Sequence, residues 1–487
     1  MPDTVPLLDL LIVGAGISGI SAACHLHRQC PGKSYQILEA RDAIGGTWDL
    51  FRYPGIRSDS DMHTFGFAFK PWSDPKALAD GPAIKAYLQE AVDEYGVAQH
   101  IRFGQKVTQA RWQDDESQWQ VLAEDREGRP HHYRTRVLFL CSGYYNYEHG
   151  FNPELPGIGD FQGPVIHPQF WPEDLDFADR RLAVIGSGAT AVTLVPALAE
   201  RAAQVSMIQR SPSYVVSRPG VDRLAQLLNR LLPERLAYRL IRARNIWFQN
   251  AIYRRSRSRP DKLRQYLLRL NRKELGDDYP VERDFAPSYN PWDQRLCLVP
   301  DADLFKAIKS GKARVVTGLI DRITAQGVLM QSGELVEADI LITATGLELK
   351  LFGGVAFYLG DEKIDFSRRF SFHGMMVSGV PNLVWTFGYI NASWTLRADL
   401  NSRFVCEMFQ HLDRTGTTRF QPCLGKGEES MAAEPWVTDF NPGYMKRGLH
   451  LFPQQGDHLP WRNTQNYLLD RKLLGKGLLD DGVLQFS

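Results

Sequence analysis

Leu10-Leu11-Ile12-Val13-Gly14-Ala15-Gly16-Ile17-Ser18-Gly19 joins a short apolar run to a Gly-x-Gly-x-x-Gly turn near the start of the chain. The run has the length of a buried strand, residues 20–28 have helical spacing, and residues 35–38 return to strand character. Strand, glycine turn, helix and strand form a βαβ unit, which predicts a parallel sheet with a right-handed crossover. Because glycines let the backbone approach a pyrophosphate at the helix N-terminus, Gly14, Gly16 and Gly19 are candidate contacts of a dinucleotide.

A second unit of the same kind begins at residue 181. Residues 181–185 form an apolar run, the turn Gly186-x-Gly188-x-x-Ala191 follows, and a helix to about residue 201 leads to a strand at 204–209. Alanine in the third position of the turn is tolerated by the same fold. Two units imply two dinucleotides, and we expect an α/β protein with two Rossmann-like dinucleotide-binding domains.

The residues at the end of the second strand of each unit differ in charge. Glu39 stands twenty residues after Gly19, where a carboxylate can accept hydrogen bonds from an adenosine ribose. Arg210 stands at the matching place in the second unit, where it can bind a 2′-phosphate that a carboxylate would repel. The second unit is therefore expected to prefer NADPH to NADH. A surface arginine at a strand end is the alternative interpretation of Arg210.

Length and composition narrow the class of protein. The 487 residues exceed one ordinary domain, and 44% hydrophobic with 23% charged residues is typical of a globular protein. A formal net charge of +1 provides no long-range attraction to nucleic acid or to an anionic membrane. Six scattered cysteines without metal-ligand spacing, no signal peptide and no apolar run long enough to span a bilayer predict a cytoplasmic protein without a metal site.

The chain is expected to cross between the two domains twice. Residues 138–143 and 340–346 read as strands that end in small residues and glycine, which suits a close backbone crossing. The expected division is a discontinuous first domain of residues 1–150 and 375–487, a linker of residues 151–180, a second domain of residues 181–220 and 280–374, and a helical insertion of residues 221–279.

The helical insertion is strongly basic. Residues 222–274 hold fifteen Lys or Arg and four Asp or Glu. Apolar residues recur at helical spacing, namely Leu224, Leu227, Leu228, Leu231, Leu236, Leu240, Ala243 and Trp247. One interpretation is a cap whose apolar stripe packs on the domains. The other is peripheral contact with an anionic membrane at its inner face. Nucleic acid is disfavoured as a partner because no recognised motif accompanies the charge.

Two further motifs lie outside the glycine turns. Phe161-x-Gly163-x-x-x-His167-x-x-x-Trp171-Pro172 occupies the linker, and Gly45-Gly46-Thr47-Trp48 is followed by Tyr53-Pro54-Gly55 and Asp59. At every fixed position both resemble the signatures of the Baeyer–Villiger monooxygenases, a family of flavin-dependent enzymes. Residues 46–59 and 289–295 look most like the bacterial branch that includes the ethionamide-activating enzymes.

The resemblance implies a reaction and its cofactors. FAD would bind the first domain, with contributions from Gly46, Thr47, Trp48 and Asp59, and NADPH would bind the second. NADPH would reduce the flavin, and one atom of O₂ would be inserted next to a ketone carbonyl to give an ester or lactone. Such chemistry requires a fixed positive charge in a site that excludes water.

The family's arginine for this task matches Arg295, and Asp59 is its expected counter-ion. Many members have a lysine near the NADP phosphate where this chain has Gln294, which leaves more of the selection for NADPH to Arg210. Trp394 and Trp385 are candidates for the substrate side, with core packing as the alternative for each.

The linker motif itself suggests coupling between the domains. His167 and Trp171 can each make one apolar and one hydrogen-bonded contact that changes as the domains shift. A packed or solvated linker residue is the alternative interpretation of His167.

The expected substrates are apolar linear or aryl ketones, with thioethers oxidised as a side activity. One rival is a flavin monooxygenase that oxidises nitrogen or sulfur, against which Trp171 argues. A rival of another class is a non-catalytic redox sensor that binds NADPH. The sequence does not indicate an oligomeric state.

Overall fold

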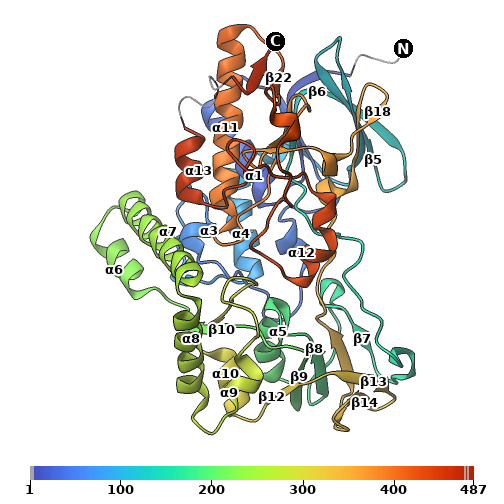
Figure 1. The fold of residues 1–487 in the computed structure, drawn as a ribbon, viewed down its shortest axis with the longest axis vertical. Helices are drawn as coiled ribbons and strands as arrows, with labels where there is room; N and C mark the ends of the chain where they lie inside the picture. Colours follow the sequence, from blue (N-terminus) through green and yellow to red (C-terminus); the bar gives the residue numbers. More distant parts are fainter. Residues whose placement is uncertain (1–4, 476–478, 480–481) are drawn as a thin grey trace.

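The computed structural model describes residues 5–475, 479 and 482–487. Two α/β parts lie one above the other, and the first described strand and the C-terminal strand both lie in the upper part (Figure 1). A pair of helices, α6 (Arg223–Leu231) and α7 (Glu234–Ser258), projects from the side of the molecule. The expected class, two Rossmann-like parts with a helical insertion, is confirmed.

The upper part is built on a nine-stranded sheet in the order β18-β17-β4-β5-β6-β1-β2-β3, with β21 paired to β6 outside this order. β1 pairs in parallel with β2 and β6, whereas β4, β5 and β6 form an antiparallel meander. The bounds of these strands are β1 (Leu7–Val13), β2 (Tyr35–Leu38), β3 (Ile101–Arg102), β4 (Lys106–Gln113), β5 (Gln118–Glu124), β6 (Pro130–Leu140), β17 (Ala356–Leu359), β18 (Glu362–Lys363) and β21 (Leu383–Trp385).

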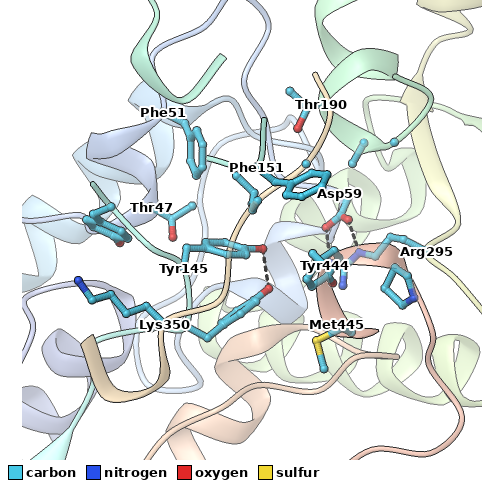
Figure 2. A pocket seen from close by; sticks show the side chains of 18 of the residues that line it. Thr47, Phe51, Asp59, Tyr145, Phe151, Thr190, Arg295, Lys350, Tyr444 and Met445 are labelled. Carbon is cyan, nitrogen blue, oxygen red and sulfur yellow. Dashed lines mark hydrogen bonds and ion pairs between the residues drawn. The ribbon is translucent and has the colours of Figure 1, made fainter. Parts of the chain in front are cut away.

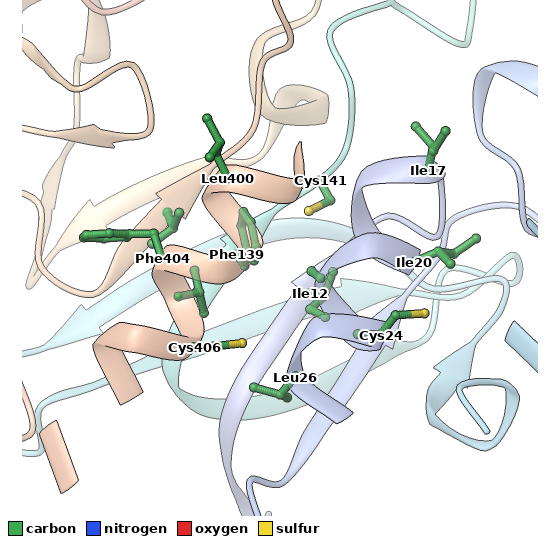
Figure 3. Close-up of a cluster of buried hydrophobic side chains, with 14 of the residues drawn as sticks. Ile12, Ile17, Ile20, Cys24, Leu26, Phe139, Cys141, Leu400, Phe404 and Cys406 are labelled. Atoms are coloured by element: carbon green, nitrogen blue, oxygen red, sulfur yellow. The ribbon is translucent and has the colours of Figure 1, made fainter. Parts of the chain in front are cut away.

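Both faces of this sheet are covered. Successive side chains of a strand point to opposite faces, so Ile12 and Phe139 join one apolar core while Leu11 and Leu138 join another. The first core is closed by α1 (Ile17–Gln29) and α11 (Trp394–Thr415), which also pack on each other (Figure 3). A strand buried on both faces must be apolar throughout, which explains why residues 10–13 show no alternation of apolar and polar residues.

The lower part has a five-stranded parallel sheet in the order β12-β9-β8-β16-β7. Its strands are β7 (Val165–Ile166), β8 (Arg181–Ile185), β9 (Gln204–Gln209), β12 (Ala313–Thr317) and β16 (Ile340–Thr343). One face packs on α5 (Ala189–Ala199) and α10 (Asp303–Lys309) through the cluster that contains Val184 and Leu194. The other face carries the small sheet β13 (Ile320–Thr324), β14 (Gly327–Met330) and β15 (Leu335–Glu337).

Shorter elements complete the fold. The remaining helices are α2 (Thr47–Leu50), α3 (Met62–Phe65), α4 (Gly81–Glu94), α8 (Pro260–Leu275), α9 (Val281–Phe285), α12 (Gly443–Gly448) and α13 (Tyr467–Leu473). The remaining strands form three pairs, namely β10 (Val215–Arg218) with β11 (Cys297–Pro300), β19 (Ser371–Phe372) with β20 (Met376–Val377), and β22 (Phe420–Pro422) with β23 (Leu484–Phe486).

The chain returns to the upper sheet earlier than the sequence suggested. β17 pairs with β4 and β18 pairs with β17, whereas the sequence predicts that residues 280–374 belong to the second domain. The linker 151–180 also contributes structure, because β7 extends the lower sheet beside β16. β7 has only two residues, which is too short for an alternation of apolar and polar residues to be seen in the sequence. It is recognised as a strand only because it pairs with β16.

The helical insertion forms, but its apolar stripe does not pack on the domains. Leu236, Leu240 and Trp247 of α7 are exposed, whereas Tyr238 and Arg242 are buried against the upper part. The buried Arg242 guanidinium donates to the carbonyl oxygens of residues 63, 64 and 66 and pairs with Asp399 of α11 at 3.3 Å. The interpretation of the stripe as a packing face is therefore wrong, because buried hydrogen bonds of a charged residue decide which face of α7 turns inward.

The six cysteines are free thiols, all buried except the half-buried Cys423. In the described part of the chain, no helix combines the length and apolar character needed to cross a membrane.

Candidate functional site

A cavity of about 960 Å³ lies between the two glycine turns and is lined by both. Gly14 and Gly16 contribute from the upper part, and Gly186 and Gly188 contribute from the lower part. Gly19 and Ala191 do not line it, because both lie one helical turn further along, and Ala191 belongs to the core beneath the lower sheet. The fold therefore brings the two turns predicted to hold dinucleotides to one space.

Each turn begins at a glycine in a conformation that other residues adopt rarely. Gly14 has φ +103°, and a Cβ there would lie 2.7 Å from the carbonyl oxygen of Cys141. Gly186 has φ +147° and meets the carbonyl of Ala344 in the same manner. Cys141 and Ala344 directly follow the two crossing strands β6 and β16, so the expected close approach of backbone at these places is present.

Glu39 supports the first turn directly. Its carboxylate accepts hydrogen bonds from the backbone N–H of Ala15 at 2.7 Å and of Arg41 at 2.9 Å. Burial raises the pKa of Glu39, although these two N–H donors act in the opposite direction. The carboxylate also lines the cavity, so it both holds the turn in place and presents an acceptor to a ligand.

The helices that follow the turns have free N-termini. Gly16 and Gly188 are the N-cap residues of α1 and α5, and neither helix start receives a hydrogen bond from a capping side chain. The first N–H groups of a helix need partners from outside it, and a pyrophosphate supplies suitable acceptors. Both turns therefore fit a dinucleotide.

Arg210 lies at the end of β9 and lines the cavity beside Ser211 and Ser213. The side chain is exposed, and within the described residues its guanidinium has no hydrogen-bonded or ionic partner. An unpaired guanidinium beside the second turn is available to a phosphate group.

Residues 46–59 connect the two parts. Gly46, Thr47, Trp48 and Tyr53 line the cavity, and Tyr53 also packs in the core of the lower part. The backbone at Gly55 rests on the carbonyl of Thr193 in α5, and Arg57 forms an ion pair with Asp303 of α10 at 2.6 Å. The segment that carries the second signature therefore also packs on α5 and α10 of the lower part. This contact was not predicted, since residue types alone do not reveal a partner so distant in the chain.

Arg295 and Asp59 form a two-bond ion pair at the cavity wall (Figure 2). Nε of Arg295 donates to Oδ2 of Asp59 at 2.7 Å, and one terminal nitrogen donates to Oδ1 at 3.0 Å. The Asp59 charge raises the pKa of Arg295 well above its ordinary value. Burial would raise the pKa of Asp59, but the charge and hydrogen bonds of Arg295 outweigh burial and lower it. The pair is therefore fully ionised around neutrality.

The segment that carries Arg295 is held from two sides. Asp293 pairs with Arg257 of α7 at 2.8 Å, and its carbonyl accepts from the backbone N–H of Asn441. Trp292 has φ +72°, which is unusual for a residue with a side chain and turns the backbone sharply just before Gln294. Gln294 and Arg295 both line the cavity as a result.

Aromatic side chains form another part of the wall. Tyr144 stacks on Trp394 with ring centroids 5.3 Å apart, and its hydroxyl hydrogen-bonds to that of Tyr145 at 2.5 Å. Tyr145, Tyr444 and Met445 face the same space as Arg295 (Figure 2). Burial raises the pKa of Tyr145, which keeps its hydroxyl protonated.

Tyr144, Tyr145 and Tyr444 were not predicted from the sequence to line the site. The first two follow Gly143 at the carboxyl end of a strand, where ligands of open α/β sheets bind, so a signal existed for them. Tyr444 lies in α12 without any motif. Of the two tryptophan candidates, Trp394 lines the cavity, whereas Trp385 packs in the core against Phe352.

The linker motif lies outside the cavity. Phe161 is buried against the lower sheet, Gly163 passes the carbonyl of Asp339, and Trp171 packs near Phe177. His167 accepts a hydrogen bond at Nδ1 from the backbone N–H of Gln169, and its Nε2 lies 3.2 Å from the carbonyl oxygen of Gly346. Nε2 therefore carries the proton and donates to Gly346. Burial lowers the pKa of His167, which favours this neutral form.

Comparisons with known proteins agree with this geometry. The profile of a family described as "Flavin-binding monooxygenase-like" matches residues 9–284. The chain is 50% identical to "FAD-containing monooxygenase EthA" of Mycobacterium tuberculosis (strain ATCC 25618 / H37Rv), covering 99% of this chain and 98% of the relative. It is 45% identical to "Probable FAD-binding monooxygenase AlmA" of Acinetobacter baylyi (strain ATCC 33305 / BD413 / ADP1), covering 99% and 96%.

Solved structures share the whole fold. An oxidised steroid monooxygenase bound to NADP has a TM-score of 0.78 at 20% identity, and open cyclohexanone monooxygenase has a TM-score of 0.76 at 20% identity. Each alignment covers 99% of both chains. The names of these relatives and neighbours mention FAD and NADP, in agreement with the two cofactors expected here. The family resemblance inferred from the sequence motifs is confirmed, and the chain belongs to the flavin-binding monooxygenase-like family.

Proposed function

We propose that this protein is an FAD- and NADPH-dependent monooxygenase of the Baeyer–Villiger type, acting on apolar linear or aryl ketones. The overall reaction joins a ketone, O₂, NADPH and a proton to give an ester or lactone, NADP⁺ and water. The observation that carries the proposal is the Arg295–Asp59 ion pair in the wall of a cavity that reaches both glycine turns.

Residues of the two turns would hold the cofactors. Gly14, Gly16 and Glu39 would bind FAD together with Gly46, Thr47 and Trp48, and the FAD-containing relatives support this assignment. Gly186, Gly188, Arg210 and Gln294 would bind NADPH. Bound together, the cofactors supply two electrons from NADPH and transfer one atom of O₂ to the substrate while the other atom leaves as water.

Arg295 would stabilise the negative charge that develops as oxygen attacks the carbonyl carbon. A guanidinium has five N–H donors, of which Asp59 engages two. Within the described residues the guanidinium makes no other hydrogen bond, so the remaining donors are free for an anion. Asp59 fixes the orientation of Arg295. A hydrogen-bond donor that is already oriented stabilises the developing negative charge of a transition state far more than a mobile donor does.

The aromatic wall favours an apolar substrate. Tyr144, Trp394 and Met445 contribute two aromatic rings and a thioether to the cavity lining. Such a lining desolvates a ketone and limits access of water. A thioether fits the same lining, which supports sulfur oxidation as a side activity.

The test is turnover by the purified yellow holoenzyme of a panel containing aliphatic ketones, aryl ketones, a thioether and a tertiary amine. NADPH consumption is followed spectroscopically, and products are identified by mass spectrometry. Esters from ketones are expected. Sulfoxide or N-oxide without any ester would indicate the nitrogen- and sulfur-oxidising class instead. NADPH consumption that no substrate accelerates would indicate the non-catalytic sensor.

A further inference from the structure

The hairpin of α6 and α7 exposes an apolar face that no described element covers. The two helices are antiparallel, since Asp222 at the start of α6 pairs with Arg244 on α7 and Ala225 packs with Ala237 and Ile241. The exposed large apolar residues of the hairpin are Leu224, Leu227, Leu231, Leu236, Leu240, Trp247 and Phe248. Leu231 is 70% exposed and Trp247 is 66% exposed. Monomeric proteins rarely leave so many large apolar side chains uncovered in one place.

The helical repeat places these residues on one face, except Phe248, which lies about 100° around the helix from Trp247 and has the Arg218 guanidinium over its ring. In α6 the exposed apolar residues are three and four positions apart, namely Leu224, Leu227 and Leu231. In α7 the spacings are four, three and four, for Leu236, Leu240, Ala243 and Trp247. Each set forms an apolar stripe along its helix. Successive residues of a helix are about 100° apart around its axis. Around each helix axis, the stripe therefore lies about 100° from the residues that pack between the two helices, which are Ala225, Ala237 and Ile241. Because the helices are antiparallel, both stripes turn to the side opposite Tyr238 and Arg242, which bind the upper part.

Arginines flank this face at both edges. Arg223 and Arg230 lie on the outer edge of α6, and Arg235 and Arg239 lie on the far edge of α7. All four side chains are exposed, and in the ranges that the structure describes none of them has an ion pair. Apolar residues between unpaired arginines on a projecting hairpin (Figure 1) match a helix that lies in the headgroup region of a bilayer.

We propose that this apolar face, flanked by its four arginines, docks the protein on an anionic lipid surface. The positive charge of the hairpin region favours an anionic lipid surface as the partner, because residues 222–274 carry eleven more positive than negative side chains. A second copy of the chain would bring the same arginines together across a twofold interface, where like charges repel. The inference concerns a different surface from the proposed active site and does not depend on the reaction.

Co-sedimentation of the holoenzyme with lipid vesicles tests the proposal. Vesicles of equimolar phosphatidylcholine and phosphatidylglycerol are compared with vesicles of phosphatidylcholine alone at low ionic strength. Binding is expected only to the mixed vesicles and should weaken as salt is added. Equal binding to both compositions, or binding to neither, would overturn the proposal.

Variants separate the two components of the surface. L227Q/L240Q should abolish sedimentation with mixed vesicles. Changing Arg223, Arg230, Arg235 and Arg239 to glutamine should weaken binding about fivefold per residue, because each basic side chain near an anionic surface contributes about 1 kcal/mol. The matched control is L335Q/L451Q, which removes two other exposed leucines and should bind as the wild type does.

Two further outcomes would refute the lipid assignment. The proposal fails if L227Q/L240Q binds mixed vesicles as the wild type does. It also fails if the wild type binds no vesicles but forms a concentration-dependent dimer in analytical ultracentrifugation that L227Q/L240Q disrupts, since a second copy would then cover the face. NADPH oxidation without vesicles reports proper folding of each variant, so failure of lipid binding is distinguishable from failure of catalysis.

Discussion

Arg295 and Asp59 are 236 residues apart in the chain and meet in a two-bond ion pair inside the cavity. Asp59 follows a segment docked on α5, and Arg295 follows a backbone turn held by Arg257 and the chain near Asn441. The orientation of the guanidinium therefore depends on how the upper part, the lower part and the helical insertion are packed together.

Arg295→Ala should reduce ester formation by at least about a hundredfold, as loss of a preorganised donor to a developing anion does. Reduction of the bound flavin by NADPH should remain close to the wild-type rate, because every residue proposed to hold FAD or NADPH is unchanged in this variant. Stopped-flow absorbance measures the first half-reaction, and mass spectrometry measures the ester. Arg295→Lys keeps the charge but loses the paired geometry, so an intermediate yield is expected. Wild-type ester yield from Arg295→Ala would remove this residue from the mechanism.

Arg210→Gln should raise the KM for NADPH about ten- to a hundredfold, since a hydrogen bond between charged groups contributes about 1.5–3 kcal/mol. The KM for NADH should change little, because NADH has no 2′-phosphate. Steady-state kinetics with both nucleotides measures the change in preference. Lys309→Gln, an exposed charge of α10 that does not line the cavity, is the control. An unchanged ratio of the two KM values would mean that Arg210 is an ordinary surface residue.

His167→Ala should uncouple NADPH consumption from product formation. His167 links two chain segments that cross between the parts, because its ring packs on Gly150 and donates to the carbonyl of Gly346. Loss of its two hydrogen bonds costs about 1–3 kcal/mol of stability, but a purely structural residue would not change the ratio of ester formed to NADPH consumed. We expect hydrogen peroxide to rise at the expense of ester. His149→Ala, an exposed histidine nearby, should keep the wild-type ratio.

The protein should lose stability in mild acid through His373. Burial and the neighbouring Arg397 lower the pKa of His373 to about 3, whereas an unfolded histidine titrates at about 6.5. The stabilising effect of the neutral ring is therefore complete above about pH 6.5 and declines by about 1.4 kcal/mol per pH unit as the pH falls towards 3.

His373→Gln tests this effect, because glutamine does not titrate. As the pH is lowered from about 6 to 4, the thermal unfolding temperature of the His373→Gln variant should fall less steeply than that of the wild type. His450→Gln, which removes an exposed histidine, is the control. Parallel curves for wild type and His373→Gln would contradict the assignment of the acid sensitivity to His373.

Local sequence was sufficient to predict the two dinucleotide folds. Gly14 and Gly186 have positive φ values that favour glycine, so the residue type itself indicates the backbone conformation. Each turn also stands between a strand and a helix of its own unit. Such features are determined within about thirty residues, which is why the fold class and both glycine turns could be read directly.

The domain boundaries and the role of the linker motif depend on distant contacts. Residues 356–363 join the upper sheet because β4 offers a free edge, and β7 is a strand only because β16 lies beside it. The spacing of apolar residues, which recurs every two residues in a strand and every three or four in a helix, does not specify which strands pair with each other.

By itself, the sequence determined the family, the two nucleotide folds and the identity of the charged residues near them. Tertiary structure alone decided which residues share the cavity, since Tyr144, Tyr444 and the Arg295–Asp59 pair come from segments far apart in the chain. It also decided that the stripe of α7 faces outward, because the buried hydrogen bonds of Arg242 fix the opposite face. Periodicity reports that a helix has an apolar face, but whether that face meets protein or solvent depends on what the rest of the chain places beside it.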